Sequence, residues 1–324
     1  MKKKLIMLIG IMAIMVLVVF ATAYYINRDN KETYNNKEEV ISVVTSFYPT
    51  YVLTINLTDG ISDIKVDSMT DFSAGCLHDY QLTTDDMKLL SNADVFIVNG
   101  GGMEEYIEDV IDSYPHLNII DLSKGITMLE SEVHHGGDNP HVWLDPHLYM
   151  IQIENAREGL VSYIQERENA GEDYNNVNER LNSNTDAYLE DVAVLADDIN
   201  MLLDTVKDMV QNKNISNKVV VFHDSFAYLS NKAGLEVAYT IEIDEDTPLS
   251  ASDVAEVVDI IKQENIPYLF TEEQYDDTIS DRIRDETDAR VYVIDSAVTG
   301  DVDKDSYLKA MRRNIETLRK AFED

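Results

Sequence analysis

One long amphipathic segment limits the architectures open to this chain more than any other feature. From about residue 148 to residue 210 strand signals are few, and in the second part of this stretch apolar residues recur at helical spacing. They occupy positions 177, 181, 188, 192, 195, 199, 202, 203, 206 and 210. Such a stripe is typical of one helix face, whereas a coiled-coil pair, the alternative, would need a clean heptad that is missing here. The segment therefore predicts one helix long enough to join two lobes.

Short apolar runs alternate with helical patterns on both sides of this segment. Before it, "VISVVT", "VFIVNGGG" and "LNIIDLS" have strand character, and "TTDDMKLLSNAD" has helix character with Thr84 as the expected N-cap. After it, "KVVVF", "IPYLFTEE" and "VYVIDS" are strand-like and are separated by helical runs. This alternation indicates α/β layers with mainly parallel sheets. We expect an N-terminal α/β lobe at 41–172, a linking helix at 173–213 and a C-terminal α/β lobe at 214–324.

The N-terminus has the pattern of a targeting or anchoring segment. Three lysines precede an uncharged, mainly apolar run that ends near Ile26, which is long enough to span a bilayer. The positive-inside rule places the lysines in the cytoplasm and the remainder outside. We expect a signal or membrane anchor at 1–26, uncleaved rather than cleaved at "ATA", and a flexible tether at 27–40. No cysteine lies nearby, so a lipid-anchored lipoprotein is not expected.

Charge and cysteine content exclude several classes of function. Lys and Arg number 26 and Asp and Glu number 61, which gives a formal net charge of −35. Such a surface repels nucleic acid and anionic lipid and attracts cations, although plain solubility is favoured over a role in steering ligands. The chain has a single cysteine, which excludes an internal disulfide and cysteine-based zinc clusters. A metal site would therefore depend on His, Asp and Glu.

Four candidate metal ligands lie in loops of the two lobes. His223 follows "KVVVF" and Asp295 follows "VYVI", at the carboxyl ends of strands, where open α/β sheets bind ligands. His78 lies in the loop after "DIKVDSMT", and His141 lies in "DNPHVWLDPH", which opens a helix. Three imidazoles and one carboxylate make a plausible tetrahedral zinc set. A lone loop histidine is usually a surface residue, so the joint placement carries the prediction.

Further residues are candidates for supporting roles. Glu272 follows the strand "YLFT" and is the alternative fourth ligand, or, like Asp79, a carboxylate that orients a ligating imidazole. The thiol of Cys76 is a possible zinc ligand, but residues two apart in a turn seldom both reach one ion, so a role beside the metal or in packing is favoured over direct ligation. His134 and His135 lie in "SEVHHGGDNPH", where they either capture metal before it enters the site or belong to an ordinary polar loop.

The order of several motifs resembles a known family. "SFYPTY", "LHDYQLTTDDMKLLSNADVFIVNGGGMEEY", "NPHVWLDP", "VVFHDSFAYLSNKAGL" and "IPYLFTEE" follow one another as in the solute-binding proteins of ABC importers for zinc and manganese. The resemblance covers residues from about 43 to 324. It implies two α/β lobes joined by one long rigid helix, with the metal in the cleft between them. Carried over motif by motif, it implies His78, His141, His223 and Asp295 as the ligands.

The sequence also departs from that family's pattern. The lipobox cysteine is missing, and the usual Pro-His of the first motif is Leu77-His78. Cys76 stands where relatives often carry an acidic residue, and the long His/Asp-rich loop of many zinc members is reduced to "VHHGGD". Manganese-type relatives often have a glutamate where His223 stands. The histidine therefore favours zinc, although some relatives with three histidines and an aspartate carry manganese.

Three classes of function remain to be compared. The resemblance implies an extracytoplasmic protein that captures Zn²⁺, or alternatively Mn²⁺, and delivers it to an ABC permease, which links the protein to the importer's ATPase. We expect a monomer. A zinc hydrolase would need an open coordination position and a general base, and the chain has no H-E-x-x-H. A metal-containing surface adhesin is the third class. We expect no enzyme activity and no nucleic-acid partner.

Overall fold

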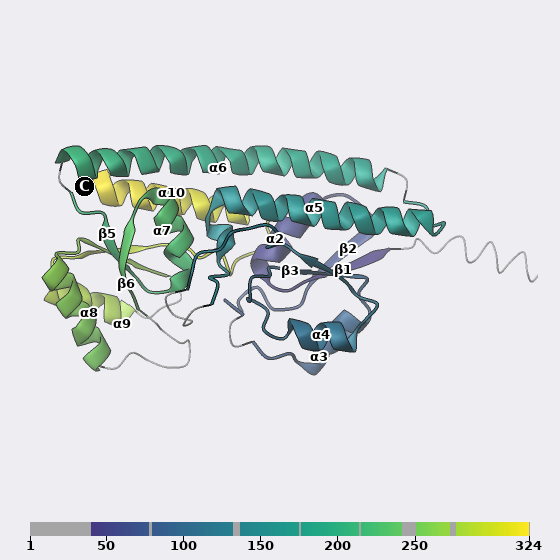
Figure 1. Ribbon diagram of the computed structural model, residues 1–324, viewed down its shortest axis with the longest axis horizontal. Coiled ribbons are helices and arrows are strands. Elements are labelled where there is room, and N and C mark those ends of the chain that lie inside the picture. Colours follow the sequence, from purple (N-terminus) through teal and green to yellow (C-terminus); the bar gives the residue numbers. More distant parts are fainter. Residues whose placement is uncertain are drawn as a thin grey trace, which may run out of the picture. The chain divides into compact units, whose positions relative to one another are not determined.

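Two four-stranded parallel sheets form the framework of the computed structural model (Figure 1). The structure describes residues 40–77, 80–131, 137–174, 176–213, 215–241, 251–272 and 277–323. The first sheet has the order β2-β1-β3-β4 and the second has the order β6-β5-β7-β8. In both sheets the chain builds outward from a first strand to one side and then to the other. The two lobes thus share a topology that their sequences do not reveal as a repeat.

The first lobe alternates strands and helices as its sequence pattern predicts. Its elements are β1 (Ile41–Thr45), α2 (Tyr48–Leu57), β2 (Ile64–Ser68), α3 (Thr84–Ser91), β3 (Val95–Val98), α4 (Ile107–Ser113), β4 (Asn118–Asp121), the 3-10 turn η1 (Val142–Leu144) and α5 (Pro146–Asn169). The β1 and β3 strands are apolar on both faces, which is typical of parallel strands covered by helices on each side.

The second lobe repeats this alternation after the long helix α6 (Val177–Lys213). Its elements are β5 (Lys218–Val221), the 3-10 turn η2 (Asp224–Phe226), α7 (Ala227–Ala233), β6 (Glu236–Thr240), α8 (Ala251–Glu264), β7 (Tyr268–Thr271), α9 (Asp277–Glu286), β8 (Arg290–Val293) and α10 (Ser306–Glu323). The expectation of two α/β lobes with parallel sheets and one long helix is confirmed.

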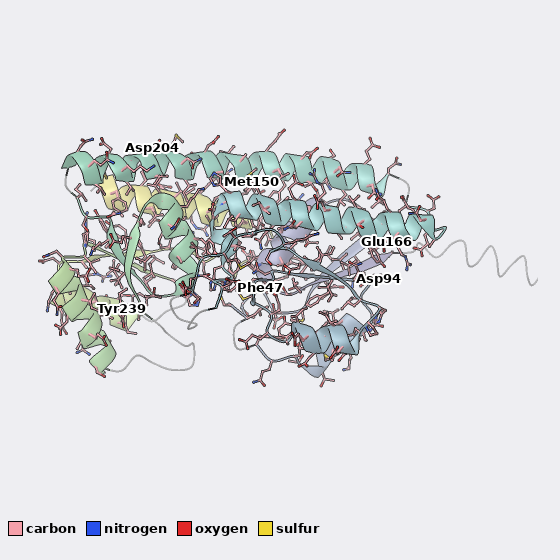
Figure 2. All side chains as sticks on the ribbon, viewed as in Figure 1. Phe47, Asp94, Met150, Glu166, Asp204 and Tyr239 are labelled. Carbon is pink, nitrogen blue, oxygen red and sulfur yellow. The ribbon has the colours of Figure 1, made fainter. Side chains whose placement is uncertain are left out.

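Helix α6 packs along both lobes. It contacts α5 and α2 of the first lobe and α10 and α7 of the second, and Figure 1 shows it running beside α5 and then beside α10. Its predicted apolar stripe is buried: Leu181, Val192, Leu195 and Ile199 are all fully shielded from solvent. The opposite face carries acidic residues such as Asp204, which Figure 2 shows on the outer side of the helix.

The faces of the strands alternate between separate hydrophobic clusters. In the first lobe Val43 faces a large cluster that includes α6, whereas Val44 faces a smaller one beside α3 and α4. In the second lobe Val219 faces the same large cluster, and Val220 faces a small one beside α8 and α9. The period of two in a strand produces this division. The lobes are therefore joined by one continuous core under α6 as well as by a linker.

The N-cap of α3 differs by one residue from the sequence prediction. The N-cap of α3 is Thr83 rather than Thr84, because the Thr83 hydroxyl accepts from Asp86 N at 3.2 Å and the Asp86 carboxylate accepts from Thr83 N at 2.7 Å.

Among the described helices, none combines the length and hydropathy needed to cross a membrane. The apolar N-terminal segment at 1–26 and the tether up to residue 39 lie outside the described residues.

Candidate metal centre

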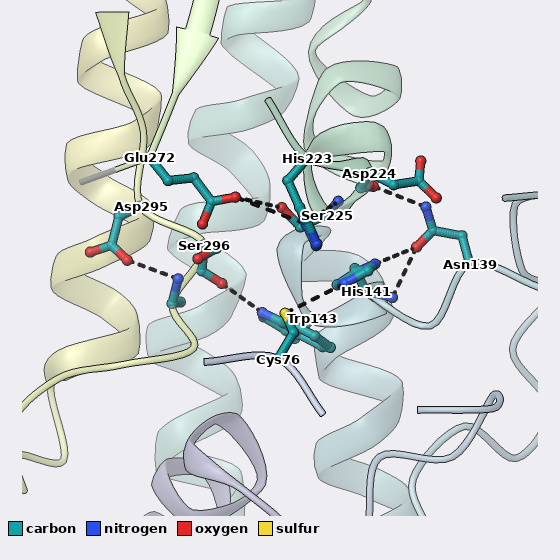
Figure 3. A network of polar contacts seen from close by, with 11 residues as sticks. Cys76, Asn139, His141, Trp143, His223, Asp224, Ser225, Glu272, Asp295 and Ser296 are labelled. Atoms are coloured by element: carbon teal, nitrogen blue, oxygen red, sulfur yellow. Dashed lines mark hydrogen bonds and ion pairs between the residues drawn. The ribbon is translucent and has the colours of Figure 1, made fainter. Parts of the chain in front are cut away.

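Three side chains that can bind metal converge between the lobes (Figure 3). The ligand atoms of Cys76, His141 and His223 all lie within 4.8 Å of one another. Cys76 comes from the loop after β2, His141 precedes η1, and His223 follows β5. The His141 ring is buried and the other two side chains are half-buried. Within the described part of the chain, these three form the cluster whose chemistry suits a transition metal.

The hydrogen bonds of His141 determine which of its nitrogens faces the cluster. Nδ1 lies 2.8 Å from the amide oxygen Oδ1 of Asn139, which also accepts from the backbone N of His141 at 3.0 Å. An amide oxygen only accepts, so Nδ1 of the neutral ring carries the proton. Nε2 therefore presents a lone pair, and it lies 3.6 Å from Sγ of Cys76. This is the tautomer that a metal ligand requires, with its other nitrogen held by a carbonyl oxygen.

His223 is held differently, as the N-cap of η2. Its Nδ1 accepts a hydrogen bond from Ser225 N at 3.0 Å, so Nε2 carries the proton of the neutral ring. Coordination through Nε2 requires that proton to move to Nδ1, which lies 3.9 Å from Oε1 of Glu272. A protonated Nδ1 can no longer accept from Ser225 N, and the Glu272 carboxylate is a candidate acceptor for its proton. The arrangement suits a ligand that changes its hydrogen bond when metal binds.

The two candidate carboxylates lie at different places in the second lobe. Glu272 follows β7 directly, is 2 % exposed and accepts from the Ser225 hydroxyl at 3.4 Å. Asp295, two residues beyond β8, accepts from Ala297 N at 2.8 Å and from the Arg313 guanidinium at 2.6 Å. The structure does not bring Asp295 into the cluster of Cys76 and the histidines. Its two carboxylate oxygens accept instead from Ala297 N and from Arg313.

Several sequence candidates fall outside the described residues. They are His78, Asp79, His134 and His135.

Asn139 is a functional residue that the sequence reading missed. Its side chain orients His141 through Oδ1, and its Nδ2 donates to the backbone oxygen of Asp224 in the second lobe at 3.0 Å. Its own backbone oxygen accepts from the Tyr228 hydroxyl at 2.7 Å. Asn139 therefore ties the orientation of a ligand to the contact between lobes. The available signal was its position two residues before His141 in "NPH", where a side-chain amide can bond back to the chain.

Further contacts hold the lobes together beside the cluster. The indole N–H of Trp143 donates to the backbone oxygen of Ser296 at 2.8 Å, and the Ser131 hydroxyl donates to the Asp224 carboxylate at 2.7 Å. Both Ser131 and Asp224 are buried. The packing of Trp143 in the large hydrophobic cluster is thus accompanied by a directed hydrogen bond across the lobes. The site lies at an interface that these contacts order.

A buried carboxyl supports the loop that carries His141. Glu104 is 3 % exposed, and its carboxyl accepts from Asn99 N at 2.8 Å and from Gly100 N at 3.0 Å. Burial raises the pKa of Glu104 to about 7, although these hydrogen bonds oppose the rise. The Asn99 side chain in turn donates to the backbone oxygen of Pro140 at 2.9 Å, directly before His141. The loop after β3 is therefore connected to the site through backbone contacts.

Comparisons with known proteins match most of the chain. The family model described as "Zinc-uptake complex component A periplasmic" matches residues 43–321. The manganese-binding lipoprotein MntA of Halalkalibacterium halodurans is 26% identical over 245 residues, covering 74% of this chain and 76% of the relative. The high-affinity zinc uptake system protein ZnuA of Bacillus subtilis is 25% identical over 311 residues, covering 90% and 91%. The zinc-binding protein AdcA of Streptococcus pyogenes is 24% identical over 310 residues, covering 87% of this chain, which spans only 56% of that relative's length.

Solved structures show the same fold. Zn(II)-bound AdcA of Streptococcus pneumoniae superposes with a TM-score of 0.72 at 21% identity, covering 88% of this chain and 58% of that one. The laminin-binding protein Lmb of Streptococcus agalactiae, whose structure is described as that of a bifunctional protein with adhesin and metal transporting activity, has a TM-score of 0.68 at 22% identity and covers 87% and 99%.

Proposed function

The chain belongs to the family of the periplasmic zinc-uptake complex component A, and from that premise we propose that it captures a divalent transition metal outside the cytoplasm and delivers it to the permease of an ABC importer. Zinc is the metal that the family and most of the named relatives indicate, and manganese is the alternative that the relative MntA indicates. The family is one of solute-binding proteins, so the metal is cargo rather than a catalytic group.

The observation that carries the proposal is the state of His141. Its Nδ1–H is held by Asn139, and its Nε2 lone pair is directed at a second metal-binding side chain, Cys76. His223 completes the group from the other lobe, so a bound ion would contact both lobes at once. Binding of such an ion would be coupled to the contact between the lobes. This coupling is what a protein needs if it is to bind a metal and later release it to a permease.

The proposed ligands are those that the sequence predicts, with the fourth position open. We assign His141 and His223 as ligands and keep His78 as a third imidazole on the strength of its motif. For the carboxylate, Asp295 is preferred by the family pattern, whereas Glu272 is buried and 3.9 Å from the His223 ring. Replacing each by its amide, Asp295→Asn and Glu272→Gln, distinguishes the two, because only the true ligand should lose a large part of the zinc affinity.

We further propose that the apolar segment at 1–26 holds the protein to the outer face of the membrane. The support is the length of the run and the lysines before it. The relative MntA is named a lipoprotein, whereas the single cysteine of this chain lies at position 76, far from the apolar segment. Fractionation of cells should recover the full-length chain with the membrane. Recovery of a shortened chain in the medium would show that the segment is a cleaved signal.

Zinc titration of a histidine variant tests the metal site. His223→Ala should lower zinc affinity by more than about 100-fold, since losing only the partner of a ligand costs about 10- to 100-fold. Competition with a chromogenic chelator measures the change. His116→Ala is the matched control, because His116 is an exposed histidine of the first lobe whose ring contact is with Tyr114.

The outcomes separate a wrong ligand from a wrong function. If His223→Ala binds zinc like the unchanged protein, His223 is not a ligand. If the unchanged protein binds neither zinc nor manganese more tightly than micromolar, the proposed function fails. Comparing the two metals in one titration series also decides between zinc and manganese as the preferred cargo.

A further inference from the structure

We propose that the sulfur of Cys76 is itself a ligand of the bound metal, next to His141 and His223, and that it makes the site selective for zinc over manganese. The inference rests on the proposed function, and it changes the donor set from nitrogen and oxygen alone to one that includes sulfur. It reverses the weight that the sequence alone gives to Cys76.

The distance between the donors fits shared coordination. A tetrahedral zinc ion with bonds of about 2.3 Å to sulfur and about 2.0–2.1 Å to nitrogen sets those two ligands about 3.6 Å apart. Sγ of Cys76 and Nε2 of His141 are 3.6 Å apart. The ligand atom of His223 lies within 4.8 Å of both. Two of the three donors thus already have the separation that the ion requires, and the His223 ring would approach them and move its proton to Nδ1.

The hydrogen-bond directions also agree with coordination. Because Asn139 holds the His141 proton on Nδ1, the Nε2 lone pair faces sulfur, and a thiol S–H fills the space between them. When a metal binds, the S–H bond breaks, the proton passes to water, and the ion takes the position between sulfur and nitrogen. No oxidant or reductant is involved. The alternative is a thiol that only donates a weak hydrogen bond to His141.

The loop around Cys76 is anchored so that the sulfur can stay in place. The next residue, Leu77, is 1 % exposed and belongs to the large hydrophobic cluster, and its backbone oxygen accepts from Tyr80 N at 3.0 Å. The preceding residue, Gly75, has φ of 74°, a value that side-chain-bearing residues rarely adopt. A buried leucine and a left-handed glycine thus fix the cysteine between them, as Figure 3 shows with Cys76 beside His141.

A sulfur donor has a direct consequence for the choice of metal. Thiolate is a soft ligand that favours zinc, whereas manganese prefers carboxylate, carbonyl and water oxygens. A carboxylate at position 76 would accommodate both ions, and sulfur would penalise manganese. The proposal therefore deepens the assignment of cargo: residue 76 is a specificity-determining ligand of this chain.

Cobalt binding tests the proposal, because Co²⁺ reports its ligands by absorption. The full-length protein loaded with one equivalent of Co²⁺ should show an intense near-ultraviolet band from sulfur-to-cobalt charge transfer. Cys76→Ser should lose this band while still binding cobalt, since its hydroxyl can donate to His141 as the thiol does. The same variant should lose zinc affinity by more than about 100-fold and manganese affinity by much less. Ser73→Ala in the same loop is the matched control.

Thiol labelling provides a second measurement that does not depend on the variant. Because the chain has a single cysteine, alkylation by iodoacetamide followed by mass measurement reports Cys76 alone. Bound zinc should slow this labelling at least tenfold in the unchanged protein, and a chelator should restore it.

The results distinguish this proposal from the proposed function. Stoichiometric cobalt binding without the charge-transfer band would overturn sulfur ligation and leave metal capture intact. Labelling that proceeds equally fast with and without zinc would overturn it as well. Failure of the unchanged protein to bind zinc, manganese or cobalt would overturn both. The band, its loss in Cys76→Ser and the protection by zinc together support the proposal.

Discussion

At the scale of single residues, an asparagine gives the site its chemical state. Asn139 holds the proton of His141 on Nδ1 and contacts the backbone of Asp224 in the other lobe. The sequence indicates His141 and His223 through their places after strands and before helices. The bond from Asn139 to His141 is local, whereas the contact of Asn139 with Asp224 could not be indicated, because these residues are 85 positions apart and meet only in the folded chain.

Asn139→Ala should weaken zinc binding about 10- to 100-fold without removing a ligand. The His141 ring would lose the oxygen that fixes its proton on Nδ1, so its Nε2 lone pair would no longer be held toward the metal. Chelator competition measures the affinity. Asn182→Ala is the control, because the Asn182 side chain donates to the backbone oxygen of Asn178 within α6. Equal affinities for both variants would contradict a positioning role.

Glu104 should make stability depend on pH in an unusual direction. Its pKa rises from 4.5 to about 7 on folding, so between these values the folded protein holds a proton that the unfolded chain releases. Stability from this group is therefore present below pH 4.5 and is lost as pH rises through 7, by about 3 kcal/mol. Urea unfolding of Glu104→Gln should show a flatter dependence across this range than the unchanged protein.

The neighbouring Glu105 provides the control for that measurement. It is exposed, so Glu105→Gln should keep the pH slope of the unchanged protein. If the curves of Glu104→Gln and the unchanged protein run parallel from pH 4.5 to 7, Glu104 does not retain its proton on folding.

At the scale of elements, the sequence was most informative where a pattern is long. The stripe on 177–210 predicted α6, and the β-branched runs predicted strands in both lobes, because burial of a face repeats at every turn or every second residue. The residues at which individual helices begin were predicted less well. Thr83 rather than Thr84 caps α3, since only Thr83 stands three residues before Asp86, whose carboxylate can bond back.

Two adjacent residues of α6 should differ sharply in their effect on stability. Leu195 is fully buried in the large core, whereas Val194 is 52 % exposed on the outer side of the helix. Leu195→Ala should lower the free energy of unfolding by about 2–5 kcal/mol, because it removes buried apolar contacts and leaves a cavity. Val194→Ala should change it by no more than about 0.5 kcal/mol. Urea denaturation measures both, and similar losses would contradict the observed orientation of α6.

The position of Asp295 illustrates what element patterns leave out. The strand before it was visible in the sequence, and so was its place beyond the strand end. Its pairing with Arg313 was not, because that contact depends on how α10 packs beside β8. A loop carboxylate can therefore be located from sequence while its partner in the folded chain cannot.

At the scale of the whole molecule, the two lobes share one core. Val43 of the first sheet, Val219 of the second and Leu195 of α6 belong to the same cluster. Tyr48 donates to the backbone oxygen of Asp301 at 2.9 Å, and Trp143 donates to that of Ser296. These partners are 253 and 153 residues apart, so no local pattern could have revealed them. The division into two α/β lobes was predictable from the sequence. The hydrophobic core and hydrogen bonds that the two lobes share were not.

Thermal unfolding should therefore occur in one transition rather than lobe by lobe. Circular dichroism at helix and sheet wavelengths should give coincident curves. Zinc at about 100 times its dissociation constant should raise the stability of the whole chain by about 2.7 kcal/mol, and a chelator should reverse the shift. Two separated transitions, with only one moved by zinc, would show that the lobes unfold independently.

The placement of Trp143 has an optical consequence. It is the only tryptophan in the chain, it is fully buried, and its ring centre lies 5.3 Å from that of His141. Ultraviolet light absorbed by indole therefore excites a single fluorophore that stands beside the proposed metal ligands and is hydrogen-bonded across the two lobes. We expect its emission to respond to charge on the neighbouring imidazole and to separation of the lobes. The chain would then contain its own fluorescent reporter of cargo arrival and release, with no label to attach.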